Sequence, residues 1–297
     1  MKQSNGIYQM HKINLASISK YTDLPSILND RTSEVKYKNY QSIIREFENE
    51  KWKSLISLSE SSNTEIKDLS AMMHSELSLK PFLYQGSIYV DTPLNISNKF
   101  IEHSIHILKN IYTENECSSL VEVGAGYGRL LIPLVDSMED SRAKKILGLD
   151  LTESSGLILS NLSNRLNYNI ESSVIDISGK NAVCHNKKLL LSAQKPLIFS
   201  CQTLMYAPKV DDDFINLMKI WPDGIFCNIE PVFYENASND LQKLQRKYVV
   251  LNDYNRNLEE KLFLYADKDL IEILYSEDLI ISENAFLPLK VYLWKFV

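Results

Sequence analysis

From about residue 118 onward, short apolar runs alternate with longer segments in which apolar residues recur at helical spacing. The short runs have the length of buried strands, and the longer segments read as amphipathic helices. This alternation predicts a doubly wound α/β sheet with helices on both faces. The predicted strands are 120–123, 145–149, 170–177, 196–201, 224–229, 270–274 and 287–297. The predicted helices between them are 127–136, 152–166, 187–192, 212–220 and 238–262.

The first third of the chain has a different pattern. Apolar residues recur at helical spacing over 33–58, 64–77 and 97–112, whereas 81–92 reads as an irregular crossing segment. Helices that are apolar on one face cannot bury themselves alone, so they must pack on the later domain or on a second subunit. We expect residues 1–95 to form an N-terminal helical extension that acts as a lid, and 96–297 to form the main domain. Packing without movement and a homodimer both stay open.

A glycine-rich stretch follows the first predicted strand of the main domain. Gly124, Gly126 and Gly128 stand at alternate positions after Glu122 and before the next helix. Glycine allows the backbone to turn sharply and to approach a ligand closely, because no Cβ intervenes. The dinucleotide fingerprint G-x-G-x-x-G needs a glycine where this chain has Arg129. The loop therefore predicts a nucleotide-containing ligand and argues against a nicotinamide dehydrogenase.

The pattern Glu122-x-Gly124-x-Gly126-x-Gly128 resembles the first motif of the class I S-adenosylmethionine-dependent methyltransferases. The resemblance covers about residues 99–297. It implies a Rossmann-like domain with a seven-stranded, mostly parallel sheet whose last strand is antiparallel. It also implies S-adenosyl-L-methionine as the cofactor, with the glycine loop at the methionine end and Glu122 acting through water or the ammonium group.

Further cofactor contacts are expected at the ends of the following strands. Asp150 ends the second strand, where a carboxylate can accept hydrogen bonds from both ribose hydroxyls. The resemblance maps adenine recognition onto Asp176 and Ile177 and the methionine half onto Cys201. Arg129 is a candidate for the cofactor carboxylate, with a helix-surface arginine as the alternative. The full predicted cofactor set is Glu122, Gly124, Ala125, Gly126, Gly128, Arg129, Asp150, Leu151, Asp176, Ile177 and Cys201.

Catalytic candidates follow from the chemistry of methyl transfer. The protein must align the acceptor with the methyl group, and a hydroxyl acceptor also needs a base, whereas a carboxylate does not. Glu230 at the end of the fifth strand and Tyr206 after the fourth are the candidates for base or acceptor contact. The alternative for Glu230 is that it only ends its strand. Residues 202–205 lack the Asn/Asp-Pro-Pro-aromatic tetrapeptide of methyltransferases that act on amino groups of bases.

Composition argues against nucleic acid as a partner. The net charge is −6 and the pI is near 5.5, whereas nucleic-acid binders usually carry a basic face. No apolar run approaches the ~20 residues of a membrane span, and the N-terminus lacks a signal-peptide core. The four cysteines lack the short spacings of metal or redox sites, so we expect reduced thiols, no metal and a cytoplasmic location.

The sequence thus predicts a transferase of natural product biosynthesis that methylates a hydroxyl or carboxylate oxygen of a small molecule or a peptide. An N-methyltransferase acting on an amine or peptide nitrogen is the enzymatic alternative. A catalytically inactive cofactor-binding partner subunit is the non-enzymatic one, because the glycine loop and the acids predict binding and not transfer.

Overall fold

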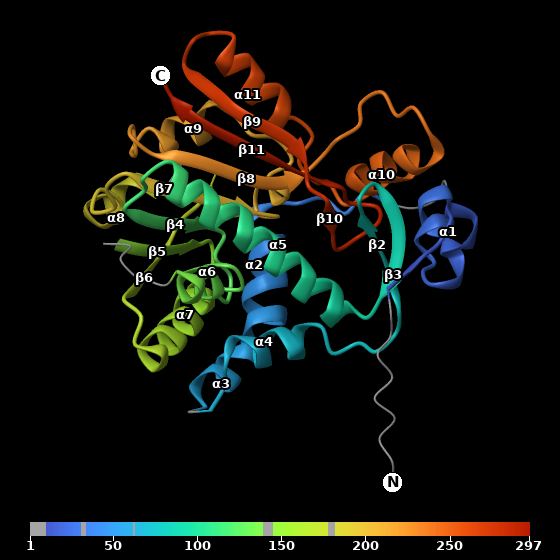
Figure 1. Ribbon diagram of the computed structural model, residues 1–297, viewed down its shortest axis with the longest axis horizontal. Helices are drawn as coiled ribbons and strands as arrows, with labels where there is room; N and C mark the ends of the chain where they lie inside the picture. Colours follow the sequence, from blue (N-terminus) through green and yellow to red (C-terminus); the bar gives the residue numbers. More distant parts are fainter. Residues whose placement is uncertain (1–9, 31–33, 62, 139–144, 178–181) are drawn as a thin grey trace.

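The computed structural model describes residues 10–30, 34–61, 63–138, 145–177 and 182–297. Its strands form a four-stranded sheet in the order β1-β3-β2-β10 and a seven-stranded sheet in the order β6-β5-β4-β7-β8-β11-β9 (Figure 1). The large sheet consists of β4 (Ser119–Val123), β5 (Lys145–Asp150), β6 (Ile170–Val174), β7 (Pro196–Cys201), β8 (Ile225–Pro231), β9 (Ile271–Asp278) and β11 (Leu289–Phe296).

The large sheet is parallel except at one strand. β4 to β8 run parallel to one another, and β11 lies antiparallel between β8 and β9. The chain leaves β4 for β5 on one side and later returns to β7 on the other, so the strand order switches direction between β4 and β7. The predicted fold class, a doubly wound sheet with an antiparallel last strand, is confirmed.

Helices cover both faces of the large sheet. One apolar core contains Leu120 of β4 with residues of α5 (Pro93–Glu114), α6 (Leu131–Ser137) and α7 (Glu153–Leu166). The other contains Val121 and Val123 with residues of α8 (Ala182–Leu190), α9 (Asp212–Met218) and α11 (Leu258–Ala266). Successive side chains of a strand point to opposite faces, so β4, whose residues are buried on both faces of the sheet, supplies both cores.

The N-terminal part mixes strands with helices. It contains β1 (His11–Lys12), η1 (Leu15–Lys20), α1 (Leu24–Asn29), α2 (Tyr40–Ile44), η2 (Arg45–Trp52), α3 (Lys53–Glu60), α4 (Ile66–Met73), β2 (Lys80–Tyr84) and β3 (Ser87–Asp91). β2 also pairs with β10 (Ile281–Ser282) from the end of the chain. The extension thus contains strands beside the predicted helices. Its boundary near residue 95, which lies inside α5, and its role as a lid stay predictions.

Three other elements differ from their predicted form. Residues 81–92 are mostly the hairpin of β2 and β3, which turns at Gly86 with φ +69°. The predicted helix over 238–262 is divided into α10 (Asp240–Leu251) and α11, because the chain turns at Asp253, with φ +52°. Asn255 then accepts a hydrogen bond from the backbone N–H of Leu258, the first residue of α11. The helix predicted over 33–58 begins at Tyr40 and passes through the π-helical turn η2.

Among the described helices, none combines the length and the apolar character that crossing a membrane requires. Within the same ranges, no group of three His, Cys, Asp or Glu side chains is arranged to hold a metal ion.

Candidate active site

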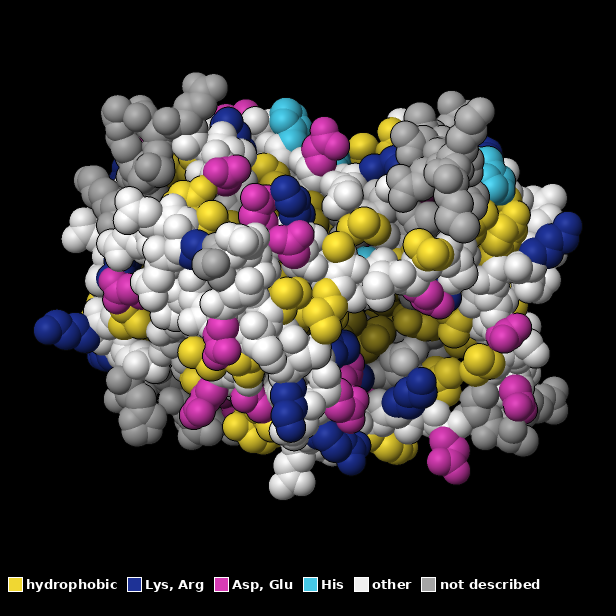
Figure 2. All heavy atoms as spheres, turned by 90° about the horizontal axis from the view of Figure 1, so that it is seen from below, with side chains coloured by type: hydrophobic (Ala, Val, Ile, Leu, Met, Phe, Trp, Pro, Cys, Tyr) yellow, Lys and Arg dark blue, Asp and Glu magenta, His cyan; other side chains and the backbone are white. Residues whose placement is uncertain are grey.

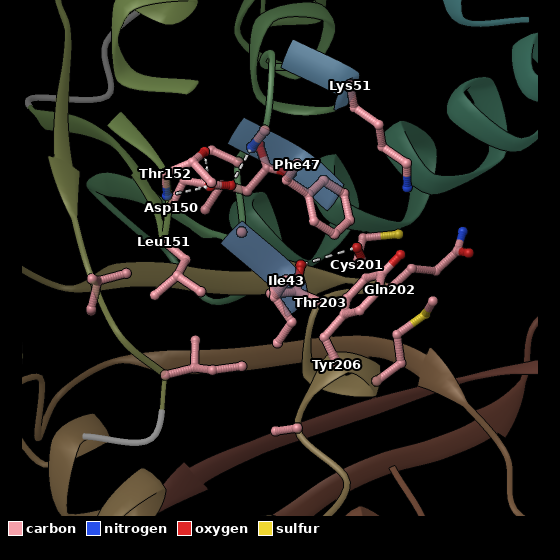
Figure 3. Close-up of a pocket in the computed structure, with 18 of the residues that line it drawn as sticks. Ile43, Phe47, Lys51, Asp150, Leu151, Thr152, Cys201, Gln202, Thr203 and Tyr206 are labelled. Atoms are coloured by element: carbon pink, nitrogen blue, oxygen red, sulfur yellow. Dashed lines mark hydrogen bonds between the residues drawn. The ribbon is translucent and has the colours of Figure 1, made fainter. Parts of the chain in front are cut away.

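A pocket of about 490 Å³ lies at the carboxyl ends of β4, β5 and β7, where the strand order switches direction. Ligands of open α/β sheets bind at such a position, and the volume lies within the roughly 300–1,000 Å³ of ligand pockets. Figure 3 shows side chains of the N-terminal helices, among them Ile43, Phe47 and Lys51, facing those of Cys201 and Tyr206 across the cavity. The pocket is therefore built from both parts of the chain.

The glycine loop forms one wall of the pocket. Gly124 and Gly126 line it with φ values of +79° and +52°, a conformation that L side chains rarely adopt. The N–H groups of Gly124 and Ala125 donate to the carbonyl of Leu149 on β5 at 2.7 and 3.0 Å. Gly128 does not line the pocket; a Cβ there would lie 2.7 Å from Leu159 and 2.8 Å from Ile132. Its predicted cofactor contact is corrected to a packing role between helices.

Asp150 lines the pocket at the end of β5. Its Oδ2 accepts a hydrogen bond from the N–H of Gly126 at 2.8 Å, and its Oδ1 accepts two from Thr152, at 3.0 Å from N–H and 2.7 Å from the hydroxyl. Burial raises the pKa of the Asp150 carboxyl above its ordinary value, and these donors only partly offset it. Oδ2 therefore has a lone pair that can accept a hydrogen bond from one ribose hydroxyl. Oδ1 can accept from the other ribose hydroxyl only if the Thr152 side chain turns away.

The remaining predicted cofactor contacts also reach the pocket. Leu151 follows β5, and Asp176 and Ile177 follow the end of β6 at Val174. Cys201 ends β7, and burial raises the pKa of its thiol well above the ordinary value, so it stays protonated at neutral pH. The structure thus brings these residues together with the glycine loop, although they come from four successive strand ends.

Glu122 and Arg129 both line the pocket and are both engaged with the protein. Glu122 accepts a hydrogen bond at 3.1 Å from the N–H of Leu131 at the start of α6, and burial raises its pKa well above the ordinary value. Arg129 pairs with Glu283 through both terminal nitrogens and donates to Ser97 at 2.8 Å. The charge of Arg129 is therefore already balanced, which weakens its predicted role as the partner of a cofactor carboxylate.

Glu230 holds a loop rather than facing the pocket. It is 1% exposed, does not line the pocket, and accepts hydrogen bonds from the Ser200 hydroxyl and from the N–H groups of residues 203–205 at 2.8–3.3 Å. The lone pairs of both carboxylate oxygens are directed to the turn that follows β7. The expectation of a base or acceptor contact at Glu230 is thus corrected: this residue positions Thr203 and Met205, which do line the pocket.

Replacing Glu230 with glutamine should change how stability depends on pH. Burial, only partly offset by the hydrogen bonds, raises the pKa of Glu230 to about 7 from an ordinary 4.5. A raised folded-state pKa contributes stability that is fully present below pH 4.5 and is lost as the pH rises to about 7, on the order of 3 kcal/mol in all. Urea unfolding at pH 5, 6 and 7 should show the wild-type advantage over E230Q shrinking as the pH rises. A difference independent of pH would contradict the assignment.

Tyr206 lines the pocket as predicted, on the turn after β7. Its ring meets Phe47 edge-on at 5.0 Å between centroids, and Lys38 Nζ lies 5.1 Å from its ring centre. Burial raises the pKa of the phenol above its ordinary value, so Tyr206 is protonated at neutral pH. Tyr206 can therefore offer its ring or a hydrogen-bond donor to a molecule in the pocket, and a protonated phenol does not act as a base.

Sequence reasoning missed the residues that cover the pocket. Trp52 lies over the glycine loop, since a Cβ on Gly126 would be 3.3 Å from its indole edge, and η2 also contributes Phe47 and Lys51. Glu48 fixes η2 to the start of α7 by accepting from the N–H and hydroxyl of Ser154. π-Helical turns are rare and often lie at functional sites. The amphipathic pattern over 33–58 showed that this segment needed a partner, but not which surface it covers.

Two buried donors beside the pocket have no partner. Trp52 Nε1 and Arg129 Nε make no hydrogen bond with any part of the chain that the structure describes, and both residues line the cavity. An unpaired buried donor costs roughly 1–3 kcal/mol. Acceptor atoms of a bound ligand would remove that cost.

No protein-family model and no curated protein matches the chain. Among solved structures, a SAM-dependent methyltransferase from Aquifex aeolicus is 15% identical, with a TM-score of 0.41 over 63% of this chain and 88% of that one. Another from Clostridium acetobutylicum is 16% identical, with a TM-score of 0.44 over 65% and 90%. The magnesium protoporphyrin IX methyltransferase from Synechocystis, with bound SAH, is 11% identical, with a TM-score of 0.46 over 68% and 86%. The strand order of the large sheet, with β11 antiparallel between β8 and β9, is the seven-stranded, mostly parallel arrangement that the sequence predicted.

Proposed function

We propose that the protein is an S-adenosylmethionine-dependent methyltransferase that methylates an oxygen, hydroxyl or carboxylate, of a small-molecule or peptide-derived natural product in the cytoplasm. The observation that carries the proposal is that a glycine-lined bend, Asp150 and Asp176 meet in one pocket at the switch point of the sheet. Each comes from a different strand end, so their meeting is a property of the fold and not of one local motif.

The groups that line the pocket match the chemistry of this cofactor. Gly124 and Gly126 line the pocket closely packed against Thr203 and Trp52, where a Cβ would lie 2.0 and 3.3 Å from those side chains. Asp150 offers an oxygen to the ribose, residues 176 and 177 lie at the place for adenine, and the donors at Trp52 Nε1 and Arg129 Nε lack acceptors. These residues would hold S-adenosyl-L-methionine, which supplies an electrophilic methyl group when bound.

The chain's own part in the reaction is to align the acceptor, exclude water and, for a hydroxyl, take a proton. Phe47 and Trp52 cover the cavity from the N-terminal side, which supports the proposed lid. His74 also lines the cavity, and burial, reinforced by the charge of Arg129, lowers its pKa, so its imidazole is neutral at pH 7 and can accept a proton. A carboxylate acceptor would need no base.

Replacing Asp150 with alanine should weaken binding of S-adenosylhomocysteine by about 1–3 kcal/mol, or roughly 5- to 150-fold, because hydrogen bonds to a charged group are lost. Isothermal titration calorimetry measures this directly. Asp150 also accepts hydrogen bonds from Gly126 and Thr152, so its loss can loosen the glycine loop. The melting temperature without ligand reports that loosening and separates it from the loss of a ligand contact. Unchanged affinity would remove Asp150 from the ribose site.

The product decides between the oxygen and nitrogen alternatives. Incubation with methyl-labelled S-adenosylmethionine and acceptor-containing extract should label a product, and mild base should release methanol from an ester but not from an ether, amide or amine. We expect an ester or an ether. Binding of S-adenosylhomocysteine without any labelled product would instead favour the inactive partner subunit.

A further inference from the structure

The acceptor side of the pocket carries positive charge. Three lysines line it: Lys38 from the segment just before α2, Lys51 from η2, and Lys209 from the loop after Tyr206. Among the described lining residues, the acids are Glu122, Asp150 and Asp176, which lie on the side that the proposed cofactor occupies. The two halves of the cavity therefore differ in charge: the proposed cofactor side carries these acids and Arg129, whose charge Glu283 balances, and the space beside it carries the lysines.

One carboxylate serves two of these lysines. Glu46 accepts from Lys38 Nζ at 2.9 Å and from Lys51 Nζ at 2.8 Å, and it does not itself line the pocket. Burial alone would raise the pKa of Glu46, but the hydrogen bonds from both lysines outweigh it and lower the pKa, so Glu46 is ionised at neutral pH. Two ammonium groups and one carboxylate leave an excess positive charge at the cavity wall.

That excess charge is partly shielded from water. The side chain of Lys38 is only 12% exposed, and its Nζ lies 5.1 Å from the ring centre of Tyr206 and 5.8 Å from that of Tyr254. Lys51 Nζ lies 4.1 Å from the ring centre of Phe47. A poorly solvated cation gains more from a counter-charge than an exposed one does. The surrounding rings offer an apolar surface beside the charge.

The face of the molecule seen from below is hollowed (Figure 2). Figure 2 shows a hollow whose interior is hydrophobic, with Lys or Arg and Asp or Glu side chains around its rim. In Figure 3, the Lys51 side chain extends from η2 toward the space beside Cys201 and Gln202. A ligand that enters between these residues would meet an ammonium group and an aromatic wall together.

We infer that the lysine pair Lys38 and Lys51 binds a carboxylate of the acceptor, so the acceptor is an anion with an aromatic or otherwise apolar body. This inference rests on the proposed function for the position of the cofactor. The shared Glu46 balances one of the two ammonium charges, and the bound anion supplies the second negative charge. The rings of Phe47 and Tyr206 contact the apolar body. Cationic acceptors are disfavoured by the same charges.

The test uses phenylacetate, phenylacetamide and phenethylamine, which share an apolar body and differ in charge. Each is titrated by ligand-observed NMR into the full-length protein, with and without saturating S-adenosylhomocysteine. Phenylacetate should bind about tenfold more tightly than the neutral amide, as one charge-assisted hydrogen bond predicts. Equal affinities, preference for the amine, or binding of none of the three would overturn the inference. Failure of S-adenosylhomocysteine to bind would count against the proposed function instead.

Three variants separate ligand binding from a structural role of the cluster. Lys38→Met together with Lys51→Met should abolish the preference for phenylacetate, whereas Lys53→Met, at an exposed position next to η2, should retain it. Glu46→Gln removes the competing carboxylate and should strengthen the preference. If the cluster served only to hold η2, the lysine double variant and Glu46→Gln would each weaken the binding of all three probes alike. That result for Glu46→Gln would contradict the inference even if the double variant folds poorly.

Discussion

Replacing Gly124 with alanine should lower the affinity for S-adenosylhomocysteine by at least about 100-fold, or roughly 3 kcal/mol. The residue has φ +79°, and a Cβ there would lie 2.0 Å from Thr203 Oγ1 and 2.6 Å from Thr203 Cβ. Because the second distance involves the base of the side chain, a rotamer change alone cannot relieve the overlap. The turn after β7 must move, and it lines the same pocket. Calorimetric titration measures the loss.

Gly86→Ala is the matched control for that variant. Gly86 has φ +69° in the turn between β2 and β3, and a Cβ there would meet nothing within 4 Å. Both alanines thus carry a similar backbone cost of about 1–2 kcal/mol, and only the one at position 124 disturbs the pocket. G86A should bind S-adenosylhomocysteine like the wild type. Equal affinities of G124A and G86A would show that the glycine loop is not at the cofactor.

Replacing Glu283 with glutamine should lower the free energy of unfolding by about 3 kcal/mol, because Arg129 is left as an uncompensated charge. Arg129 and Glu283 are 21% and 18% exposed, and Gln202 Nε2 also donates to Glu283 at 3.2 Å. The pair joins the end of the glycine loop to the C-terminal part of the chain. Partial exposure places the expected loss at the low end of the range for buried pairs. Urea unfolding followed by circular dichroism measures it.

Glu272→Gln is the control for this pair. Glu272 pairs with Lys295 at 3.0 Å, but the two side chains are 52% and 41% exposed. Solvent screens such pairs, which typically contribute less than about 1 kcal/mol. Similar losses in E283Q and E272Q would mean that Arg129 is not held by a shielded ion pair.

The glycine-loop side of the pocket was predictable because its signals are local. Each strand of a parallel sheet ends at the same edge, so an acid directly after β5 or close after β6 must lie near the glycine loop. Asp150 and Asp176 reach the pocket for this reason. The strand pattern also predicted the large sheet, since buried parallel strands read as short apolar runs.

The parts that were not predictable depend on contacts between distant segments. Glu230 ends β8, and the sequence does not say whether its side chain faces outward or under the neighbouring turn; the pairing of β8 with β7 decides this. Trp52 lies far from Gly126 in the sequence, and only the packing of η2 brings the two together. The break between α10 and α11 depends on a turn at Asp253, with φ +52°, which interrupts an otherwise continuous helical pattern.

A crystal structure of the protein with S-adenosylhomocysteine tests the central claim most directly. The account predicts the adenosine between Asp150 and residues 176–177, with the sulfur beside the glycine loop and facing the space bounded by Tyr206 and the lysine pair. Density for the ligand elsewhere, or a pocket that stays closed to it at saturating concentration, would contradict the account.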